Sequence, residues 1–261
     1  MIRVNKKYLV DKQYRTADNF KIRSNLHRYG INKTPFWPWV RDKYPIFPGN
    51  KILEVGCGLG TFWKEVYQTI PKTCEITLSD ISPGMITASQ ETLKEYLLSK
   101  PILNFEVTDI ENLSYPAAHF DLIIAHFMLY HADSPEKALL EIKKVLKENG
   151  HVGIMLPSKN NMQKLFDLLT IENPIQAQNF SSEIALSVLP NYFSTIQTYS
   201  NENMLQIDST EAIVNYIKTL STMDQKSKAF YKYCKTLLEK YIQQEGFLLL
   251  PIQQLLFVVS C

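Results

Sequence analysis

Short apolar runs alternate with helical patterns through the middle of the chain, which is typical of a parallel β-sheet covered by helices. The apolar runs predict five strands, at residues 51–55, 75–78, 104–107, 120–125 and 151–156. The run at 120–125 is apolar on both faces, as expected for a central strand of a parallel sheet. The pattern therefore predicts a doubly wound, Rossmann-like α/β fold.

Helices are expected between these strands, at residues 61–70, 82–99 and 134–149. Ser82 is a favoured N-cap, and the proline that follows it suits the first helical position. Ser134-Pro135 begins the third of these helices. At its end, Asn149-Gly150 predicts a left-handed cap.

The hydrophobic pattern is weaker beyond residue 157. It predicts helices near 160–170, 181–189, 210–221 and 225–245, and strands near 193–200 and 253–259. The first 45 residues lie outside the predicted sheet and have a helical pattern around 17–29. We therefore expect an N-terminal helical cap at 1–45 and an α/β domain at 46–261, in which residues 160–250 contribute a substrate pocket and lid.

The overall composition is that of a globular protein, with 45% hydrophobic and 21% charged residues. The net charge of +2 is too small to indicate a nucleic-acid partner. Residues 1–43 nevertheless carry 11 Lys and Arg against 3 Asp and Glu. Such a basic arm suits an anionic ligand, nucleic acid or a lipid surface, and it also fits a solvated surface without a partner.

The four cysteines have neither metal-ligand spacing nor the pattern of a short disulfide framework: Cys57, Cys74, Cys234 and Cys261. They predict no metal site and favour the reducing cytoplasm. The apolar segment at 247–261 is too short to span a membrane, so we expect a buried strand there and no membrane partner. The sequence carries no indication of an oligomeric state.

Glycines follow the first predicted strand in the segment Glu54-Val-Gly-Cys-Gly-Leu-Gly60. Glycine permits a positive φ and lets the backbone approach a ligand closely. The helix that follows offers free N–H groups and a partial positive charge at its N-terminus. Because ligands of such sheets bind beyond the carboxyl ends of the strands, this loop is a candidate binding site.

Acidic residues end the next two predicted strands and strengthen the prediction of a binding site at the loop. Asp80 lies 20 residues after Gly60, where a carboxylate can accept hydrogen bonds from both hydroxyls of a ribose. Asp109 ends the third strand, where it can accept from an adenine amine, while Ile81 and Ile110 bracket the ring. Three strand ends therefore point to one adenosine-containing ligand.

The loop spacing distinguishes between adenosine cofactors. A dinucleotide loop has the pattern G-x-G-x-x-G, whereas this loop is G-x-G-x-G, with Thr61 in place of the third dinucleotide glycine. No Lys or Arg balances a pyrophosphate, and Glu54 would repel phosphate but attract an ammonium group. S-adenosylmethionine carries an ammonium and a sulfonium and no phosphate, so the charge pattern favours it.

Five segments of the chain resemble class I methyltransferases, most closely the small-molecule branch known as type 11. They are ILEVGCGLGTFW (52–63), SDISPGM (79–85), TDIENLSY (108–115), FDLIIAHFMLYH (120–131) and SPEKALLEIKKVLKENGHVGIM (134–155). The resemblance implies a seven-stranded sheet of order 3-2-1-4-5-7-6 with strand seven antiparallel. It also implies S-adenosylmethionine as the methyl donor, S-adenosylhomocysteine as its product, and no metal.

The resemblance further implies a set of cofactor-binding positions. Asp80 would hold the ribose, and Asp109 the adenine edge. The remaining positions form the methionine-side loop, the adenine surroundings and the methyl-facing end of the fourth strand: Glu54, Gly56, Cys57, Gly58, Gly60, Ile81, Met85, Ile110 and His126.

Methyl transfer is a direct displacement, in which positioning and desolvation supply much of the rate and a base is needed only for a protonated acceptor. His126 and His131 are the candidate bases, with acceptor orientation as the alternative for His126 and a structural hydrogen bond for His131. The candidates for the lid and acceptor contacts are Tyr14, Arg23, His27 and Tyr130.

The sequence therefore predicts a methyltransferase that acts on a small-molecule acceptor of unspecified identity. Three alternatives stay open: a methyltransferase acting on RNA or protein, which the basic arm suggests; a non-catalytic module that binds S-adenosylmethionine; and a nicotinamide-dependent oxidoreductase, against which the loop spacing argues. Strong salt dependence of RNA binding would support the first alternative.

Overall fold

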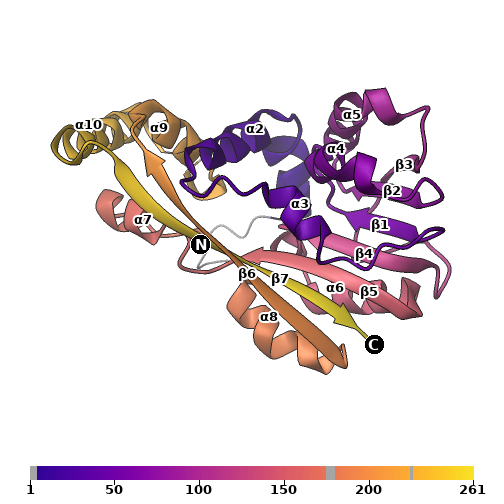
Figure 1. Cartoon of the computed structure of the whole chain (residues 1–261). Helices are drawn as coiled ribbons and strands as arrows, with labels where there is room; N and C mark the ends of the chain where they lie inside the picture. Colours follow the sequence, from indigo (N-terminus) through magenta and orange to yellow (C-terminus); the bar gives the residue numbers. More distant parts are fainter. Residues whose placement is uncertain (1–4, 175–179, 224–225) are drawn as a thin grey trace.

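The computed structural model describes residues 5–174, 180–223 and 226–261. Within them, seven strands form one sheet of order β3-β2-β1-β4-β5-β7-β6 (Figure 1). Strands β1 to β5 are parallel, and β7 is antiparallel to both β5 and β6. The strand bounds are β1 Lys51–Val55, β2 Glu75–Asp80, β3 Ile102–Val107, β4 Phe120–His126, β5 Leu146–Pro157, β6 Thr195–Ile207 and β7 Leu248–Ser260. The predicted fold class and strand order are confirmed.

Helices cover both faces of the sheet (Figure 1). Helices α3 (Phe36–Arg41), α4 (Thr61–Val66) and α5 (Pro83–Thr92) pack on one face. Helices α6 (Pro135–Val145) and α8 (Ser182–Val188) pack on the other. The sheet and its two helical layers form the three-layer sandwich expected for alternating strands and helices.

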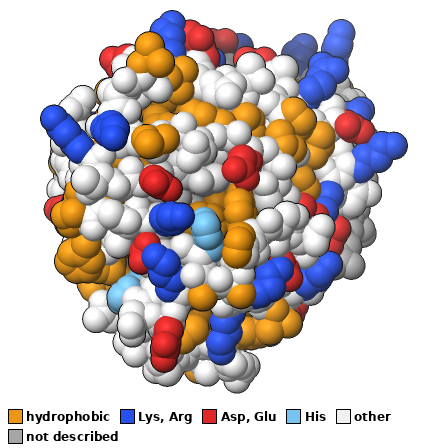
Figure 2. Space-filling view, turned by 90° about the vertical axis from the view of Figure 1, so that its right-hand side faces the viewer, with side chains coloured by type: hydrophobic (Ala, Val, Ile, Leu, Met, Phe, Trp, Pro, Cys, Tyr) orange, Lys and Arg blue, Asp and Glu red, His pale blue; other side chains and the backbone are white. Residues whose placement is uncertain are grey.

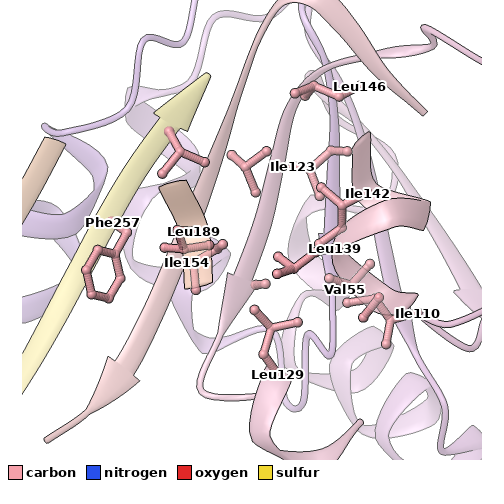
Figure 3. Packing of buried hydrophobic residues seen from close by; sticks show 14 of the residues in the cluster. Val55, Ile110, Ile123, Leu129, Leu139, Ile142, Leu146, Ile154, Leu189 and Phe257 are labelled. Atoms are coloured by element: carbon pink, nitrogen blue, oxygen red, sulfur yellow. The ribbon is translucent and has the colours of Figure 1, made fainter. Parts of the chain in front are cut away.

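Aliphatic side chains of β1, β4, β5 and α6 form the core between the sheet and the helices α6 and α8. Figure 3 shows Val55, Ile123 and Ile154 of the strands beside Leu139 and Ile142 of the helix. All five side chains are almost completely buried. Because side chains alternate along a strand, Glu54 next to Val55 points to the opposite face. The Glu54 carboxylate therefore lies on the face of the sheet that α3, α4 and α5 cover.

Strands β6 and β7 form a long ribbon that extends beyond the rest of the sheet (Figure 1). The pairing of β7 with β5 ends at Gln254, whereas its pairing with β6 continues to Leu248. Pro251 lies in this extension, where β7 pairs with β6 alone. Proline lacks an N–H, and it is tolerated there because no strand on the other side of β7 needs one. The strands predicted at 193–200 and 253–259 are therefore much longer than expected.

Three helices pack on the extended ribbon and make a second lobe: α7 (Gln163–Leu169), α9 (Thr210–Lys218) and α10 (Lys228–Glu245). They correspond to helices predicted near 160–170, 210–221 and 225–245, of which residue 225 lies outside the described residues. In Figure 1, α2 (Asp18–Asn25) lies between α9 and α4. The N-terminal part of the chain thus bridges the second lobe and the sheet.

The N-terminal part is helical, with α1 (Lys6–Tyr8), a π-helix η1 (Leu9–Gln13), α2 and a 3₁₀-helix η2 (Leu26–Tyr29). The region near Gly30 then bridges to β6 at Leu205. The division of the chain at residues 45 and 46 stays a prediction.

The cap predicted at Asn149-Gly150 is wrong. Helix α6 ends at Val145, and Leu146 already has the extended backbone of β5 (φ −76°, ψ 137°). Gly150 is not left-handed. A Cβ on Gly150 would lie 2.7 Å from the Leu146 side chain, so glycine is needed there for close approach. Within the residues described, the model has no helix of the length and apolarity that a membrane span requires.

Candidate functional site

The glycine loop between β1 and α4 needs all three of its glycines. Gly56, Gly58 and Gly60 have φ values of 68°, 54° and 68°, in the left-handed region that side chains disfavour. A Cβ on Gly56 would also lie 2.7 Å from Cβ of Met128, and one on Gly60 would lie 2.9 Å from the Leu93 side chain. The loop therefore passes tightly between the ends of β4 and α5, and residues 57–60 are buried.

Asp80 at the end of β2 is tied to this loop. One carboxylate oxygen accepts the Gly58 N–H at 3.1 Å, and the other accepts the Ser82 N–H at 2.9 Å. Burial raises the pKa of Asp80 to about 6, although these two hydrogen bonds oppose the shift. Each carboxylate oxygen keeps a second lone pair, so the group can still accept two hydroxyl hydrogen bonds.

Asp109, which follows β3, is paired with the N-terminal part of the chain. One of its carboxylate oxygens accepts the Glu111 N–H at 3.0 Å, and the other accepts a bond from Lys6 Nζ at 2.6 Å. Lys6 also forms an ion pair with Glu111. Burial of Lys6 disfavours its charge, but the bonds to Asp109 and Glu111 outweigh that effect and raise the pKa of Lys6.

The apolar residues expected around an adenine lie beside these carboxylates. Ile110 and Met85 are buried, at 6% and 1% exposure, and Ile81 is half-buried. Met85 lies in the first turn of α5, which Ser82 caps through the Met85 N–H. The strand ends of β1, β2 and β3 therefore combine two carboxylates, a glycine loop and apolar side chains at one edge of the sheet.

Residues 6–20, here called the cover segment, lie across this edge. Ser82 Oγ donates a hydrogen bond to the Tyr14 carbonyl at 2.8 Å. A Cβ on Gly84 would lie 2.2 Å from the Arg15 carbonyl, and one on Gly58 would lie 3.1 Å from the Phe20 ring. A cavity of about 460 Å³ borders the contact, lined by Val10, Asp11, Arg15, Ser82, Pro83 and Gly84. The cover segment thus touches the loops after β1, β2 and β3.

Glu54 does not present a free carboxylate to the loop. One of its oxygens accepts the Trp63 indole N–H at 2.6 Å, and the other lies 3.2 Å from His126 Nδ1. The second ring nitrogen of His126 lies 2.7 Å from the Tyr44 hydroxyl. The side chains of Glu54 and His126 are each 3% exposed, so this pair is buried between the sheet and the helices α3, α4 and α5.

The hydrogen bonds among Tyr44, His126 and Glu54 indicate where the protons of this buried group lie. Burial and the charge of Glu54 raise the pKa of Tyr44 well above its usual value, so the phenol keeps its proton and can donate it to His126 Nε2. His126 Nδ1 then carries the proton that faces Glu54. Both ring nitrogens of His126 are therefore occupied, which favours a structural or positioning role over that of a base.

Tyr44 and Trp63 were not expected from the sequence as partners of Glu54 and His126. A Cβ on Gly153 of β5 would lie 2.3 Å from the Tyr44 ring, so this glycine makes room for the tyrosine over the sheet. The only signal in the sequence is a glycine within an apolar strand, which indicates a close approach without naming the partner.

Two other residues near the loop have clear surroundings, the expected Cys57 and Phe127, which the sequence did not single out. Burial raises the pKa of the Cys57 thiol well above its usual value, so Cys57 is a neutral, packed side chain of the loop. Phe127, directly after His126, has a φ of 53°, which is uncommon for a residue other than glycine. The left-handed turn at Phe127 carries the chain from β4 to Met128, beside Gly56.

A second group of polar side chains lies where the cover segment, α2 and the loop after β4 meet. Tyr14 Oη lies 3.0 Å from His131 Nε2 and accepts a hydrogen bond from Arg23 Nη1 at 3.1 Å. Burial and the charge of Arg23 lower the pKa of His131 to about 3, so its ring is neutral. Burial also raises the pKa of Tyr130, so its phenol stays protonated.

The structure thus brings three of the four expected lid and acceptor residues together, namely Tyr14, Arg23 and Tyr130. His27 lies in η2, beyond the end of α2, and its side chain is exposed. Its side chain makes no hydrogen bond to any residue that the structure describes. Within the same residues, no group of three His, Cys, Asp or Glu side chains has the arrangement of a metal site.

Comparison with known proteins identifies the domain around the glycine loop. Residues 53–154 match the family model described as "Methyltransferase domain". The ubiquinone/menaquinone biosynthesis C-methyltransferase UbiE of Hydrogenovibrio crunogenus is 30% identical over 147 residues, which cover 55% of this chain and 56% of that protein. A malonyl-[acyl-carrier protein] O-methyltransferase of Ilyobacter polytropus is 33% identical over 140 residues, covering 52% and 50%.

The chain therefore spans about half the length of these two relatives. Among solved structures, the YcgJ protein of Bacillus subtilis has the same fold, with a TM-score of 0.60 at 15% identity over 86% of this chain and 97% of that one. The sheet order, the glycine loop with its strand-end carboxylates and the match over residues 53–154 agree with one another. Residues 53–154 are therefore similar to the methyltransferase domain, and they lie in a sheet with the strand order that the resemblance to class I methyltransferases implied.

Proposed function

We propose that this chain transfers a methyl group from S-adenosylmethionine to a small-molecule acceptor by direct displacement. The observation that carries the proposal is the placement of Asp80. Its carboxylate bridges the glycine loop and the start of α5, and it keeps lone pairs for two hydroxyls. A buried carboxylate with a raised pKa at a strand end is expected at a binding site, and no Lys or Arg among the described residues forms an ion pair with Asp80 to offset its burial.

The donor set at this edge fits S-adenosylmethionine. Asp80 would hold the ribose, Asp109 the adenine amine, and Ile81, Met85 and Ile110 the faces of the ring. The glycine loop, which has no bulky side chain at its three glycines, would lie against the methionine tail. When bound, S-adenosylmethionine supplies a methyl group on a sulfonium, which needs no activation by a metal.

The loop does not provide for the ammonium group in the way that the sequence suggested. Both oxygens of Glu54 already accept bonds from Trp63 and His126. We propose instead that Glu54 supports the loop from behind, since it anchors the end of β1 to α4. The absence of a basic side chain between Gly56 and Gly60 still argues against a pyrophosphate.

The acceptor is proposed to bind beside the loop after β4, among Tyr14, Tyr130 and His131. With a pKa of about 3, His131 is a poor base at neutral pH, because a general base works best with a pKa near the working pH. We propose that His131 orients the acceptor through a hydrogen bond and that positioning supplies most of the rate.

The alternative of an RNA or protein acceptor has less support from the structure. Two of the basic residues that suggested it, Lys6 and Arg23, point inward to Asp109 and to Tyr14. Figure 2 shows acidic and basic side chains interspersed with apolar ones on one face of the molecule. The four cysteines are free thiols, three of them buried, which supports the cytoplasm as the proposed compartment.

The proposed function is tested by incubating the full chain with methyl-labelled S-adenosylmethionine and a panel of oxygen, nitrogen, carbon and sulfur acceptors. We expect S-adenosylhomocysteine to form with at least one small acceptor and not with RNA. Tight binding of the methyl donor without turnover on any acceptor would favour the non-catalytic binding module, and no binding would contradict both.

The affinity for the cofactor should fall below about pH 6. Because Asp80 has a pKa of about 6 in the free protein, it is mostly protonated at pH 5 and must lose that proton to accept two hydroxyl bonds. Linkage predicts a loss approaching tenfold per pH unit as the pH falls through this range. Calorimetric titration with S-adenosylhomocysteine between pH 5 and 8 checks this, and an Asp80→Ala variant with the same decline would assign the effect to another group.

A further inference from the structure

Arg23 of α2 is held at the junction between the cover segment and the second lobe. Its Nε donates to Thr219 Oγ1 at 3.1 Å, and its Nη2 donates to the Thr219 carbonyl at 2.9 Å. Thr219 follows α9 and is itself buried. This pair of bonds uses one edge of the guanidinium and sets the direction of the other edge.

The other edge, formed by Nη1 and Nη2, faces neutral groups. Nη1 donates to the Tyr14 hydroxyl at 3.1 Å, and the Gln13 amide oxygen, when turned toward the guanidinium, accepts from Nη1 at 3.3 Å and from Nη2 at 3.1 Å. Burial raises the pKa of Tyr216 to about 12, and Arg23 opposes that shift, so this nearby phenol stays neutral as well. His131, hydrogen-bonded to the same Tyr14, is also neutral.

The charge of Arg23 is therefore uncompensated within the described part of the chain. No Asp or Glu there forms an ion pair with it, although Lys6, only 17 residues earlier, has two carboxylate partners. Arg23 is half-buried, and withdrawing a cation from water without a counter-charge is costly, so an anion bound beside it would lower that cost. Arginine suits a carboxylate in particular, because its two parallel N–H groups match the two oxygens.

Resting on the proposed function, we propose that Arg23 binds a carboxylate group of the methyl acceptor. The Nη1–Nη2 edge receives the two oxygens in place of the neutral Gln13 amide oxygen, and the hydroxyls of Tyr14 and Tyr130 donate further hydrogen bonds. The substrate class is thereby a small carboxylic acid, bound with its carboxylate toward α2 and α9.

The position of Arg23 on α2 favours the acceptor over the methionine tail of the cofactor as the source of the carboxylate. Phe20, one helical turn earlier, is the α2 residue that covers Gly58 of the glycine loop. Arg23 lies a turn further toward α9 and bonds to Thr219 of the second lobe. His131, which follows β4, connects the two regions through Tyr14.

The test uses ¹³C-formate as the bare carboxylate probe, titrated against chloride at constant ionic strength. The full chain is first saturated with S-adenosylhomocysteine, so that the cofactor's own carboxylate is already in place. Ligand-observed NMR should show saturable formate binding to the wild type and binding at least tenfold weaker to Arg23→Gln. Arg23→Lys, which keeps the charge but not the parallel N–H groups, should lie between them.

Arg28→Gln is the matched control, because Arg28 is an exposed arginine nearby whose side chain hydrogen-bonds to Tyr29 and to no other residue that the structure describes. It should bind formate as the wild type does. Equal formate binding by Arg23→Gln and the wild type, or no saturable binding to a wild type that holds S-adenosylhomocysteine, would overturn the inference alone.

Two further outcomes separate the sources of the carboxylate. If Arg23→Gln loses tenfold or more in affinity for S-adenosylhomocysteine, and formate competes with that ligand, Arg23 holds the cofactor tail and the acceptor assignment is wrong. If the folded wild type does not bind S-adenosylhomocysteine at all, the proposed function fails and the inference fails with it. Thermal unfolding of each variant shows whether Arg23→Gln remains folded, and Arg23→Lys provides the comparison if it does not.

Discussion

Asp80→Ala is expected to weaken binding of S-adenosylmethionine by about 1.5–3 kcal/mol, or roughly 10- to 150-fold. The substitution removes the acceptor proposed for both ribose hydroxyls, and hydrogen bonds to a charged group are of this size. It also leaves the N–H groups of Gly58 and Ser82 without their present acceptor, so the glycine loop loses its tie to α5. Titration calorimetry at pH 7.5 measures the change.

Asp42→Ala is a suitable control for that measurement, because Asp42 is an exposed carboxylate at the end of α3, away from the loop. Its affinity for the cofactor should equal that of the wild type. A thermal melt of Asp80→Ala distinguishes a folded protein with weak binding from an unfolded one. Wild-type affinity in folded Asp80→Ala would show that Asp80 only supports the turn into α5.

His126→Leu is expected to lower the free energy of unfolding by about 1.5–3 kcal/mol, because it removes the hydrogen bond from the imidazole to the buried Glu54 carboxylate. Tyr44 loses its acceptor at the same time. Since neither ring nitrogen of His126 is free to meet an acceptor, turnover by the folded variant should stay within about tenfold of the wild type. Urea unfolding and initial rates at low temperature measure the two effects.

A double-mutant cycle provides the control for His126. In a Glu54→Gln background no charge is stranded, so His126→Leu should cost at least about 1 kcal/mol less than in the wild type. The opposite pattern, unchanged stability with turnover reduced about 100-fold or more, would restore His126 as the catalytic base.

Asp80 and Glu54 lie at the same edge of the sheet, but only the role of Asp80 could be predicted from local sequence. Asp80 was identifiable because a strand, a glycine loop and a carboxylate 20 residues later form a local pattern. The bonds that Asp80 makes to Gly58 and Ser82 are nearly local as well. Glu54 belongs to the same segment, yet the sequence assigned it to a ligand, because its partners Trp63 and His126 come from α4 and β4.

The helix ends show the same contrast. Ser82-Pro83 marks the start of α5 correctly, because a cap is satisfied within a single turn. Asn149-Gly150 has the composition of a cap but lies within β5. There, pairing of Leu146 with Phe120 extends the strand, and Gly150 is needed for its close approach to Leu146.

By itself, the sequence determined the sheet, its order through the resemblance, and the loop and carboxylates at the strand ends, because hydrophobic periodicity and short-range turn chemistry carry that information. Only the tertiary structure decided which polar groups are already satisfied and which are not. Glu54 is paired, while Arg23 is held by Thr219, 196 residues away, with no carboxylate among the described residues to balance its charge. Such pairings depend on contacts between segments far apart in the chain, and burial then determines what each charge costs.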